Sequence, residues 1–196
     1  MKTHAKNKKI KMLPIAFFTC FAMSHSTMAD EHKNVSDLAK ACTSCHGVNG
    51  ISNDKNNPNL AGQKKGYLEQ EIKAFRDGNR DNPQMLPFVS KLSDEDIDQL
   101  ATYFSTRTNN TEGVNNYNKS GENVRARCVS CHGMNGVTVT QLWPNLAGQQ
   151  SQYLQKQLLN FKSGKRKSPI MSVIAQELTD KEIAAVAEYY SQQAAY

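Results

Sequence analysis

Two stretches of the chain repeat apolar residues at the spacing of one helix face. Positions i, i+3, i+4 and i+7 are apolar in both, at Ile97, Leu100, Ala101 and Phe104 and at Ile183, Val186, Ala187 and Tyr190. Each stretch follows a Ser or Thr that has an acidic residue three positions later, at 93–96 and 179–182, which is the pattern of a capping box. The pattern therefore predicts two amphipathic helices that begin at these boxes.

The remaining pattern also favours helices. We expect helices over 64–77 and 150–163, because Gly78 and Gly164 follow them and glycine is typical of a helix end. Shorter helices are expected over 35–45 and 121–131. No segment alternates apolar and polar residues for long enough to indicate a strand, so the predicted fold class is all-α.

One offset of 86 residues superimposes the two halves of this pattern. From position 42 to position 104, 25 of 63 residues are identical to the residue 86 positions later, without a gap. The hexapeptide Pro-Asn-Leu-Ala-Gly-Gln occurs at 58–63 and again at 144–149. The chain therefore contains two copies of one domain.

The repeat suggests the domain organisation. We expect a first domain over 30–108, a linker rich in Asn, Thr and Gly over 109–120, and a second domain over 121–196. A domain of about 80 residues has only a marginal apolar core. A group embedded in each domain is therefore expected to complete its core.

The first 29 residues resemble an export signal. Residues 1–11 contain five lysines and no acid, residues 12–23 are almost entirely apolar, and Thr27, Met28 and Ala29 follow. The apolar run is too short to span a bilayer. We therefore expect residues 1–29 to be a signal peptide that is cleaved near Ala29, which predicts a periplasmic protein.

Removal of this segment changes the charge of the protein. The full chain has 24 basic and 18 acidic side chains, and loss of five lysines lowers the net charge from +6 to +1. Nucleic acid is thus not an expected partner. Residues 30–110 have 10 basic and 12 acidic side chains, and residues 111–196 have 9 and 6, so the mature chain is predicted to be a charge dipole.

The most specific motif is Cys-x-x-Cys-His, which occurs once in each repeat. The cysteines are Cys42 and Cys45 in the first copy and Cys128 and Cys131 in the second, followed by His46 and His132. Two thiols at this spacing can add to the vinyl groups of one haem, and the next histidine can ligate its iron. The sequence therefore predicts two covalently bound haem c groups. A redox disulfide or half of a zinc site is the alternative reading, which the adjacent histidine and the duplication disfavour.

The sixth iron ligand decides the function of such a haem. The mature chain has three histidines, so a second histidine is not available for both irons. Met85 and Met171 each lie 39 residues after the motif histidine, in a segment flanked by proline. We predict that they ligate the irons opposite His46 and His132, although an isolated methionine is more often a packing residue.

Four further residues are candidate haem contacts. The backbone carbonyls of Pro58 and Pro144, each 12 residues after the motif histidine, are candidates to accept the ring N–H of His46 and His132. A rigid turn is the alternative role. Arg80 and Arg166 are candidates to contact haem propionates, as are Gln63, Gln149, Tyr67 and Tyr153, and a solvent-facing arginine is the alternative.

The two motifs, the repeated hexapeptide and the matched methionines together resemble the cytochrome c4 family, over essentially all of residues 30–196. The resemblance implies two tandem class I cytochrome c domains that are related by approximate twofold symmetry. It also implies a monomeric periplasmic carrier that takes electrons from a donor such as a cytochrome bc complex. The implied acceptor is a terminal haem–copper oxidase, and peripheral association with the membrane is expected.

Two other functions are weighed against this one. A haem with His and Met ligands has no open position for substrate, so outer-sphere electron transfer is predicted rather than the chemistry of a dihaem peroxidase. A dihaem subunit of a dehydrogenase, such as a flavocytochrome, would have the same ligands. Copurification with a flavoprotein would distinguish that subunit from a free carrier.

Overall fold

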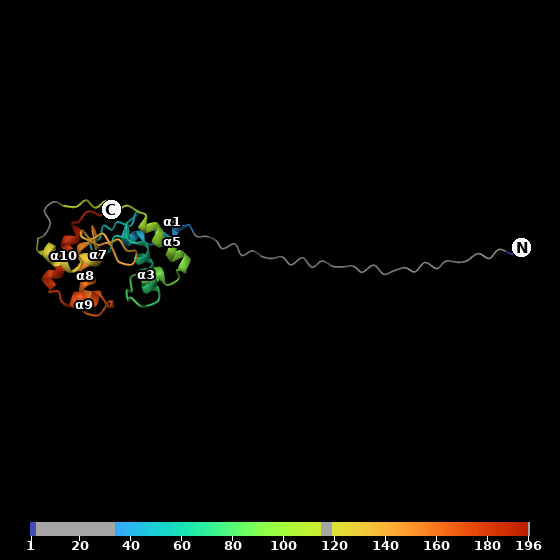
Figure 1. Ribbon diagram of the computed structural model, residues 1–196. Helices are drawn as coiled ribbons and strands as arrows, with labels where there is room; N and C mark the ends of the chain where they lie inside the picture. The colour runs from blue at the N-terminus through green and yellow to red at the C-terminus, as the bar shows by residue number, and fades with distance from the viewer. Residues whose placement is uncertain (3–33, 115–118, 196) are drawn as a thin grey trace. The chain divides into compact units, whose positions relative to one another are not determined.

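The computed structural model describes residues 1–2, 34–114 and 119–195, and every regular element in this part of the chain is helical (Figure 1). The all-α prediction is therefore confirmed. The predicted signal peptide lies outside the described residues, apart from Met1 and Lys2. None of the helices in the described ranges is long and apolar enough to cross a bilayer.

The two repeats contain corresponding helices. The first repeat contains α1 (Val35–Lys40), α2 (Thr43–His46), α3 (Lys65–Arg76), α4 (Leu86–Val89) and α5 (Asp94–Ser105). The second contains α6 (Lys119–Val124), the 3₁₀ turn η1 (Arg125–Arg127), α7 (Val129–His132), α8 (Ser151–Lys162), α9 (Met171–Gln176) and α10 (Asp180–Ser191). The long helices lie within a residue or two of the predicted ranges.

Both predicted capping boxes are present. The Ser93 hydroxyl accepts a bond from the amide of Asp96 at 3.0 Å, and the Asp96 carboxylate accepts one from the amide of Ser93 at 2.9 Å. Thr179 and Glu182 make the equivalent pair at 3.2 and 2.8 Å. These bonds satisfy amides that otherwise lack partners at the start of α5 and α10.

The segments that contain the two methionines are more regular than predicted. The flanking prolines predict loops here, but Met85 is the N-cap residue of α4 and Met171 is the first residue of α9. Pro87 lies in the first turn of α4, where a missing N–H costs nothing. The apolar periodicity of such short helices extends over too few residues to be recognised in the sequence.

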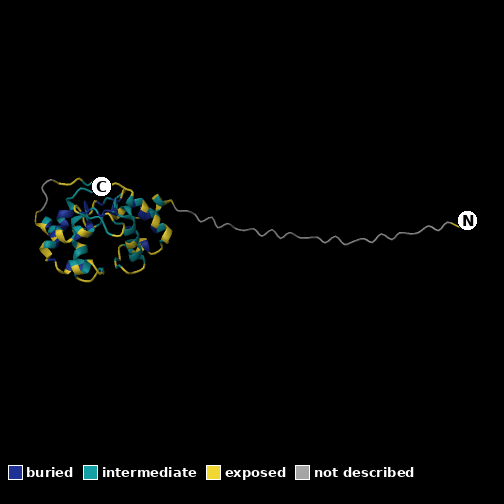
Figure 2. Cartoon of the chain, in the orientation of Figure 1, coloured by how far each residue is buried: buried dark blue, intermediate teal, exposed yellow. Residues whose placement is uncertain are grey.

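Each repeat packs its helices in the same way. In the first, α5 packs against α1 and α3, and α3 also contacts α4; in the second, α10 packs against α6 and α8, and α8 also contacts α9. The predicted apolar stripes of α5 and α10 are buried, and Ile97, Ala101 and Ile183 have no exposed surface (Figure 2). The two cores thus lie on the inner faces of α5 and α10.

The described part of the predicted linker is attached to the second repeat. The amide of Val114 donates to the carbonyl of Gln192 at 3.0 Å, and the amide of Ala195 donates to the carbonyl of Thr111 at 3.0 Å. Asn109 is buried and accepts two bonds from Thr111. Residues 109–114 therefore run alongside the C-terminal residues of the second repeat. The exact domain boundaries stay a prediction.

Candidate functional site

One cavity of about 2110 Å³ is lined by the predicted haem-binding residues of both repeats. Its lining includes the two motif histidines, all four motif cysteines, Met85 and Met171. Pockets for drug-sized ligands are roughly 300–1,000 Å³. The cavity is therefore large enough for more than one such group, and the fold brings the predicted attachment and ligand residues to its wall.

The motif histidines are buried and held in the same orientation. Nδ1 of His46 lies 2.9 Å from the carbonyl oxygen of Pro58, and Nδ1 of His132 lies 2.9 Å from that of Pro144. A carbonyl only accepts hydrogen bonds, so Nδ1 carries the proton and Nε2 keeps its lone pair. Burial lowers the pKa of both histidines, although the carbonyl contact opposes this shift. Both rings are thus neutral and oriented as metal ligands require.

The four motif cysteines are free thiols. Burial raises the pKa of Cys42 to about 11, with a smaller contribution from Cys45, and burial also raises the pKa of Cys128. Cys42 and Cys128 are therefore protonated at neutral pH. The first cysteine of each pair is the N-cap residue of a short helix, α2 or α7, and the second cysteine and the histidine are the last two residues of that helix.

The local backbone makes this arrangement possible. Gly47 and Gly133 directly follow the histidines with φ of +79° and +81°. A Cβ at either position would lie about 2 Å from the carbonyl oxygen of Ile51 or Val137. Only glycine can therefore turn the chain at the end of α2 and α7 and return it toward Pro58 and Pro144.

The lining of the cavity fits a haem group. Apolar side chains such as Leu68, Phe75, Leu154 and Phe161 cover much of the wall, as a macrocycle requires. Each repeat adds two thiols, a neutral imidazole whose Nε2 keeps its lone pair, and a thioether. This donor set suits haem c, because thioether bonds need free thiols and Met is a common partner of His on its iron.

The repeated hexapeptide joins the two repeats through reciprocal hydrogen bonds. The Gln149 side chain accepts from the amide of Asn59 at 2.7 Å and donates to the carbonyl of Asn59 at 2.9 Å. Gln63 makes the same pair of bonds with Asn145, at 2.7 and 3.0 Å. Since Asn59 and Asn145 directly follow Pro58 and Pro144, the interface is attached to the two carbonyls that orient the histidines.

A second set of contacts between the repeats surrounds the two predicted arginines. Arg80 pairs with Glu71 of its own repeat and donates to Tyr153 and Gln157 of the other, at 3.2 and 2.7 Å. Arg166 donates to Gln157 at 3.0 Å and crosses to Tyr67 and Glu71, at 3.1 and 2.5 Å. Burial raises the pKa of Tyr67 to about 12, so this hydroxyl is neutral.

We call Arg80, Arg166 and their shared partners Glu71 and Gln157 the arginine cluster. Its geometry tests one of the two roles predicted for Arg80 and Arg166. Both guanidinium groups line the cavity with side chains only 11% exposed, so the solvent-facing alternative is wrong. Their contact with haem propionates stays a prediction. Glu71 is not among the residues that the sequence pattern predicts for the site, although it stands where the second repeat has Gln157. That difference between otherwise matching positions is the signal that would have revealed it.

One buried hydroxyl has no counterpart in the first repeat. Tyr190 occupies the position of Phe104, and its hydroxyl is buried without a nitrogen or oxygen partner among the described residues. It lies beside the sulfur of Cys128, and burial together with this neighbour raises the pKa of Tyr190. The second repeat thus has a polar group at the cavity wall where the first repeat has none.

Known proteins share this architecture. The sequence model of the cytochrome c family matches residues 33–108 and again 119–193. Cytochrome c4 of Pseudomonas aeruginosa is 34% identical, over 77% of this chain and 83% of its own length. The chain belongs to the cytochrome c4 family. The solved structure of reduced recombinant cytochrome c4 from Pseudomonas stutzeri covers 81% of this chain and 96% of its own, with a TM-score of 0.76 and 30% identity.

Membership of the cytochrome c4 family confirms the predicted tandem arrangement and the two haem c groups. The chain is a cytochrome c4-like dihaem electron carrier with His/Met ligation. A further relative, from Stutzerimonas stutzeri strain A1501, is 35% identical over 78% of this chain and 79% of its own length, and it is named a thiosulfate dehydrogenase electron acceptor.

Proposed function

We propose that this cytochrome carries single electrons through the periplasm by outer-sphere transfer between two equivalent haem sites. In the first site Cys42 and Cys45 bind the haem covalently, and His46 and Met85 ligate its iron. In the second site the same roles belong to Cys128, Cys131, His132 and Met171. The supporting observation is that both repeats bring this set of groups to one cavity, with each histidine held by a proline carbonyl.

Haem c, held by these residues, would supply a one-electron Fe(III)/Fe(II) couple, and ligation by Met85 or Met171 would favour the reduced state. The protein keeps each imidazole in one orientation through Pro58 or Pro144, so that little reorganisation accompanies the change of charge. The arginine cluster places two guanidinium groups and one carboxylate between the two repeats. Its net positive charge favours reduction of both irons.

The proposed partners are a donor such as a cytochrome bc complex and an acceptor such as a terminal haem–copper oxidase. We further propose that the mature protein is monomeric, begins near Asp30 after removal of residues 1–29, and associates with the membrane only peripherally. A second candidate function is to accept electrons from a thiosulfate dehydrogenase. It is supported by the similarity to the Stutzerimonas stutzeri relative, which is named a thiosulfate dehydrogenase electron acceptor.

A spectroelectrochemical titration of the exported protein tests the proposal. We expect two one-electron couples at positive potential, both low-spin, with the far-red band of methionine bound to Fe(III). A high-spin component that reacts with peroxide would contradict permanent Met ligation. Steady-state reduction by a purified thiosulfate dehydrogenase, compared with reduction by a cytochrome bc complex, would separate the two candidate donors.

A further inference from the structure

One peptide group of the first repeat is hydrogen-bonded at both of its ends. Its carbonyl oxygen, which belongs to Pro58, lies 2.9 Å from Nδ1 of His46. Its N–H, which belongs to Asn59, donates to Oε1 of Gln149 at 2.7 Å. No peptide bond in the described residues is cis, so the C=O and N–H of this peptide point in opposite directions. The peptide therefore connects His46 of the first repeat with Gln149 of the second.

The second repeat contains the same connection in the opposite sense. Nδ1 of His132 lies 2.9 Å from the carbonyl oxygen of Pro144, and the amide of Asn145 in that peptide donates to Oε1 of Gln63 at 2.7 Å. Both histidines and both glutamines are at most 7% exposed, so water does not compete for these bonds. Each motif histidine is thus linked through one peptide group to a glutamine of the other repeat.

The orientation of each glutamine amide is fixed. Oε1 of Gln149 also accepts from the amide of Gln150 at 2.9 Å, and its Nε2 donates to the carbonyl of Asn59 at 2.9 Å. A flipped amide would place its NH₂ group against two N–H donors, which cannot accept a bond. Gln63 makes the same set of bonds in the first repeat. The acceptor oxygen of each glutamine therefore faces the other repeat.

This connection affects the histidine as a ligand. Hydrogen bonds that follow one another through a polar group polarise it and strengthen each other. An acceptor on the N–H of Asn59 therefore makes the Pro58 carbonyl a stronger acceptor for the ring of His46. A stronger acceptor at Nδ1 raises the basicity of Nε2, the nitrogen that faces the metal. A more basic ligand favours Fe(III), so the glutamine is expected to lower the reduction potential.

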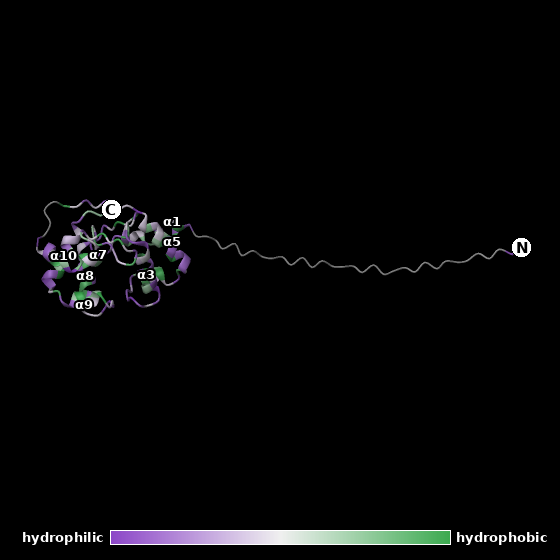
Figure 3. Ribbon diagram, viewed as in Figure 1, coloured by the Kyte–Doolittle hydropathy of each residue, from purple (hydrophilic) through white to green (hydrophobic). Residues whose placement is uncertain are grey.

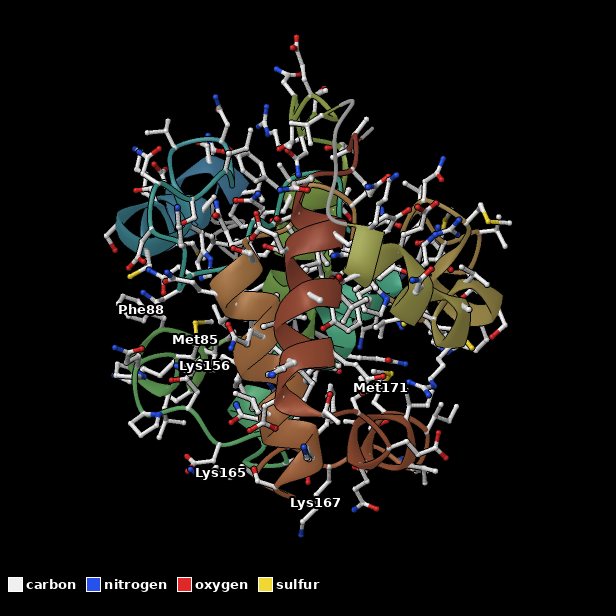
Figure 4. All side chains as sticks on the ribbon, turned by 90° about the vertical axis from the view of Figure 1, so that its left-hand side faces the viewer. Met85, Phe88, Lys156, Lys165, Lys167 and Met171 are labelled. Atoms are coloured by element: carbon white, nitrogen blue, oxygen red, sulfur yellow. The ribbon has the colours of Figure 1, made fainter. Side chains whose placement is uncertain are left out.

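The predicted methionine ligands belong to helices that pack within their own repeat. α4 packs against α3, and α9 packs against α8. α9 consists mainly of hydrophobic residues (Figure 3). Figure 4 shows Met85 and Met171 on opposite sides of α10. The two sites are thus separated in space, and the histidine is the ligand that a hydrogen-bonded connection from the other repeat reaches.

We propose that Gln149 and Gln63 are positioning residues that act crosswise. Each strengthens the bond that holds the motif histidine of the other repeat, and it thereby lowers the reduction potential of that repeat's iron. The inference rests on the proposed function, because His46 and His132 must ligate the irons. Within the identical hexapeptides, the proline and the glutamine of one copy therefore serve different sites.

The peptide of the first site receives one further bond from the second repeat. Nε2 of Gln150 donates to the carbonyl of Ser52 at 2.8 Å and to the side-chain oxygen of Asn59 at 3.2 Å. The corresponding residue of the first repeat is Lys64, which makes no such bond among the described residues. Asn59 is buried, whereas its counterpart is only half-buried. The first histidine is therefore expected to be held more firmly than the second.

Spectroelectrochemical titration of two variants tests the crosswise effect. We expect Gln149→Leu to move the couple of the His46 site to a more positive potential, which makes its reduction about threefold more favourable, and to leave the other couple unchanged. Gln63→Leu should act in the same way on the His132 site alone. Gln152→Leu is the matched control, because Gln152 is an exposed glutamine three residues from Gln149 and should move neither couple.

The assignment of the couples decides the outcome. Met85→Ala and Met171→Ala each displace the couple of one site and so identify it. If Gln149→Leu moved both couples equally, the glutamine would only stabilise the contact between the repeats, and the proposal would be wrong. A shift confined to the His132 couple would also overturn it, because the effect would stay within one repeat.

Hydrogen exchange of the histidine Nδ1 protons gives a second measurement, by NMR of the reduced protein with isotope-labelled histidine. Gln149→Leu should accelerate exchange at His46 about tenfold, whereas exchange at His132 should keep its wild-type rate. Lys64→Gln introduces the missing amide without removing a buried bond, so it remains informative if the leucine variants do not fold. It should slow exchange at His132, and an unchanged rate would contradict the proposal.

The wild-type titration keeps this test separate from that of the function. If the wild type lacked two low-spin couples, the proposed function itself would fail. If the wild type had both couples and Gln149→Leu gave the same potentials as Gln152→Leu, only the crosswise role of the glutamines would fail.

Discussion

The two repeats have kept their contacts with each other more strictly than their surfaces. Each repeat has the same hexapeptide, which makes the same reciprocal bonds, and the same Tyr and Arg that cross to the other repeat. Three residues at the cavity mouth differ between the repeats: Gln70, Asn79 and Asp81 in the first correspond to Lys156, Lys165 and Lys167 in the second. Positions at the interface must suit two partners at once, whereas positions at the mouth face solvent and can change independently.

The exceptions inside the interface are therefore informative. Glu71 is matched by Gln157, so two arginines share one carboxylate instead of two. Phe104 is matched by Tyr190, which adds a hydroxyl at the wall of one site. Such differences can make two sites with the same ligands unequal in reduction potential or in stability. Each of these two residue differences can be reversed by mutation.

The equivalence of the two ligand sets predicts the largest effects. Met85→Ala and Met171→Ala should each remove about half of the far-red Met–Fe(III) band and lower one couple by more than about 0.1 V. Spectroelectrochemistry measures both quantities. Met134→Ala is the control, because Met134 is 64% exposed and should change neither. A single variant that removed the whole band would break the equivalence.

The packing of the first helix in each repeat predicts a difference in stability. A Cβ on Gly121 would lie 2.2 Å from the carbonyl oxygen of Ala185 in α10, whereas the equivalent residue of the first repeat is the half-buried Val35. Gly121→Ala should therefore lower the free energy of unfolding by about 3 kcal/mol. Val35→Ala should cost about 1 kcal/mol. Denaturant unfolding compares them, and equal costs would show that the helix pairs pack alike.

The single carboxylate of the arginine cluster predicts a shared electrostatic effect. Glu71→Gln removes a negative charge near both sites, so both couples should rise, on the order of tens of millivolts. Gln157→Glu should lower both, and the double exchange should return them toward the wild-type values. If Glu71→Gln moved only one couple, the carboxylate would act on one site alone.

The buried hydroxyl of Tyr190 predicts the smallest effect. Tyr190→Phe reproduces the residue of the first repeat and removes an OH without a nitrogen or oxygen partner. The free energy of unfolding should stay unchanged or rise by up to about 1 kcal/mol, since a buried unpaired polar group is unfavourable. Thermal unfolding measures this change. A loss of stability would show that the contact with the Cys128 sulfur is favourable.

Much of the site was recognisable before the structure. The Cys-x-x-Cys-His motif indicates covalent haem attachment by itself. Its thiols and histidine are close in the chain, so they stay close in space in any fold. The capping boxes of α5 and α10 are equally local, and both are present. The short helices α4 and α9 were missed, because tertiary contacts rather than sequence period stabilise helices of four to six residues.

The sequence by itself determined the helical class, the duplication, the residues for two haem groups and the difference in charge between the halves. Each of these properties depends on residues that are close in the chain or on a count. Only the tertiary structure decided that Gln63 and Gln149 bond across the repeats, that Glu71 binds both arginines, and that lysines of one repeat share a hollow with Asn56 of the other. The hydrogen bonds that cross between the repeats join residues 82 to 95 positions apart, and no local pattern encodes which of them meet.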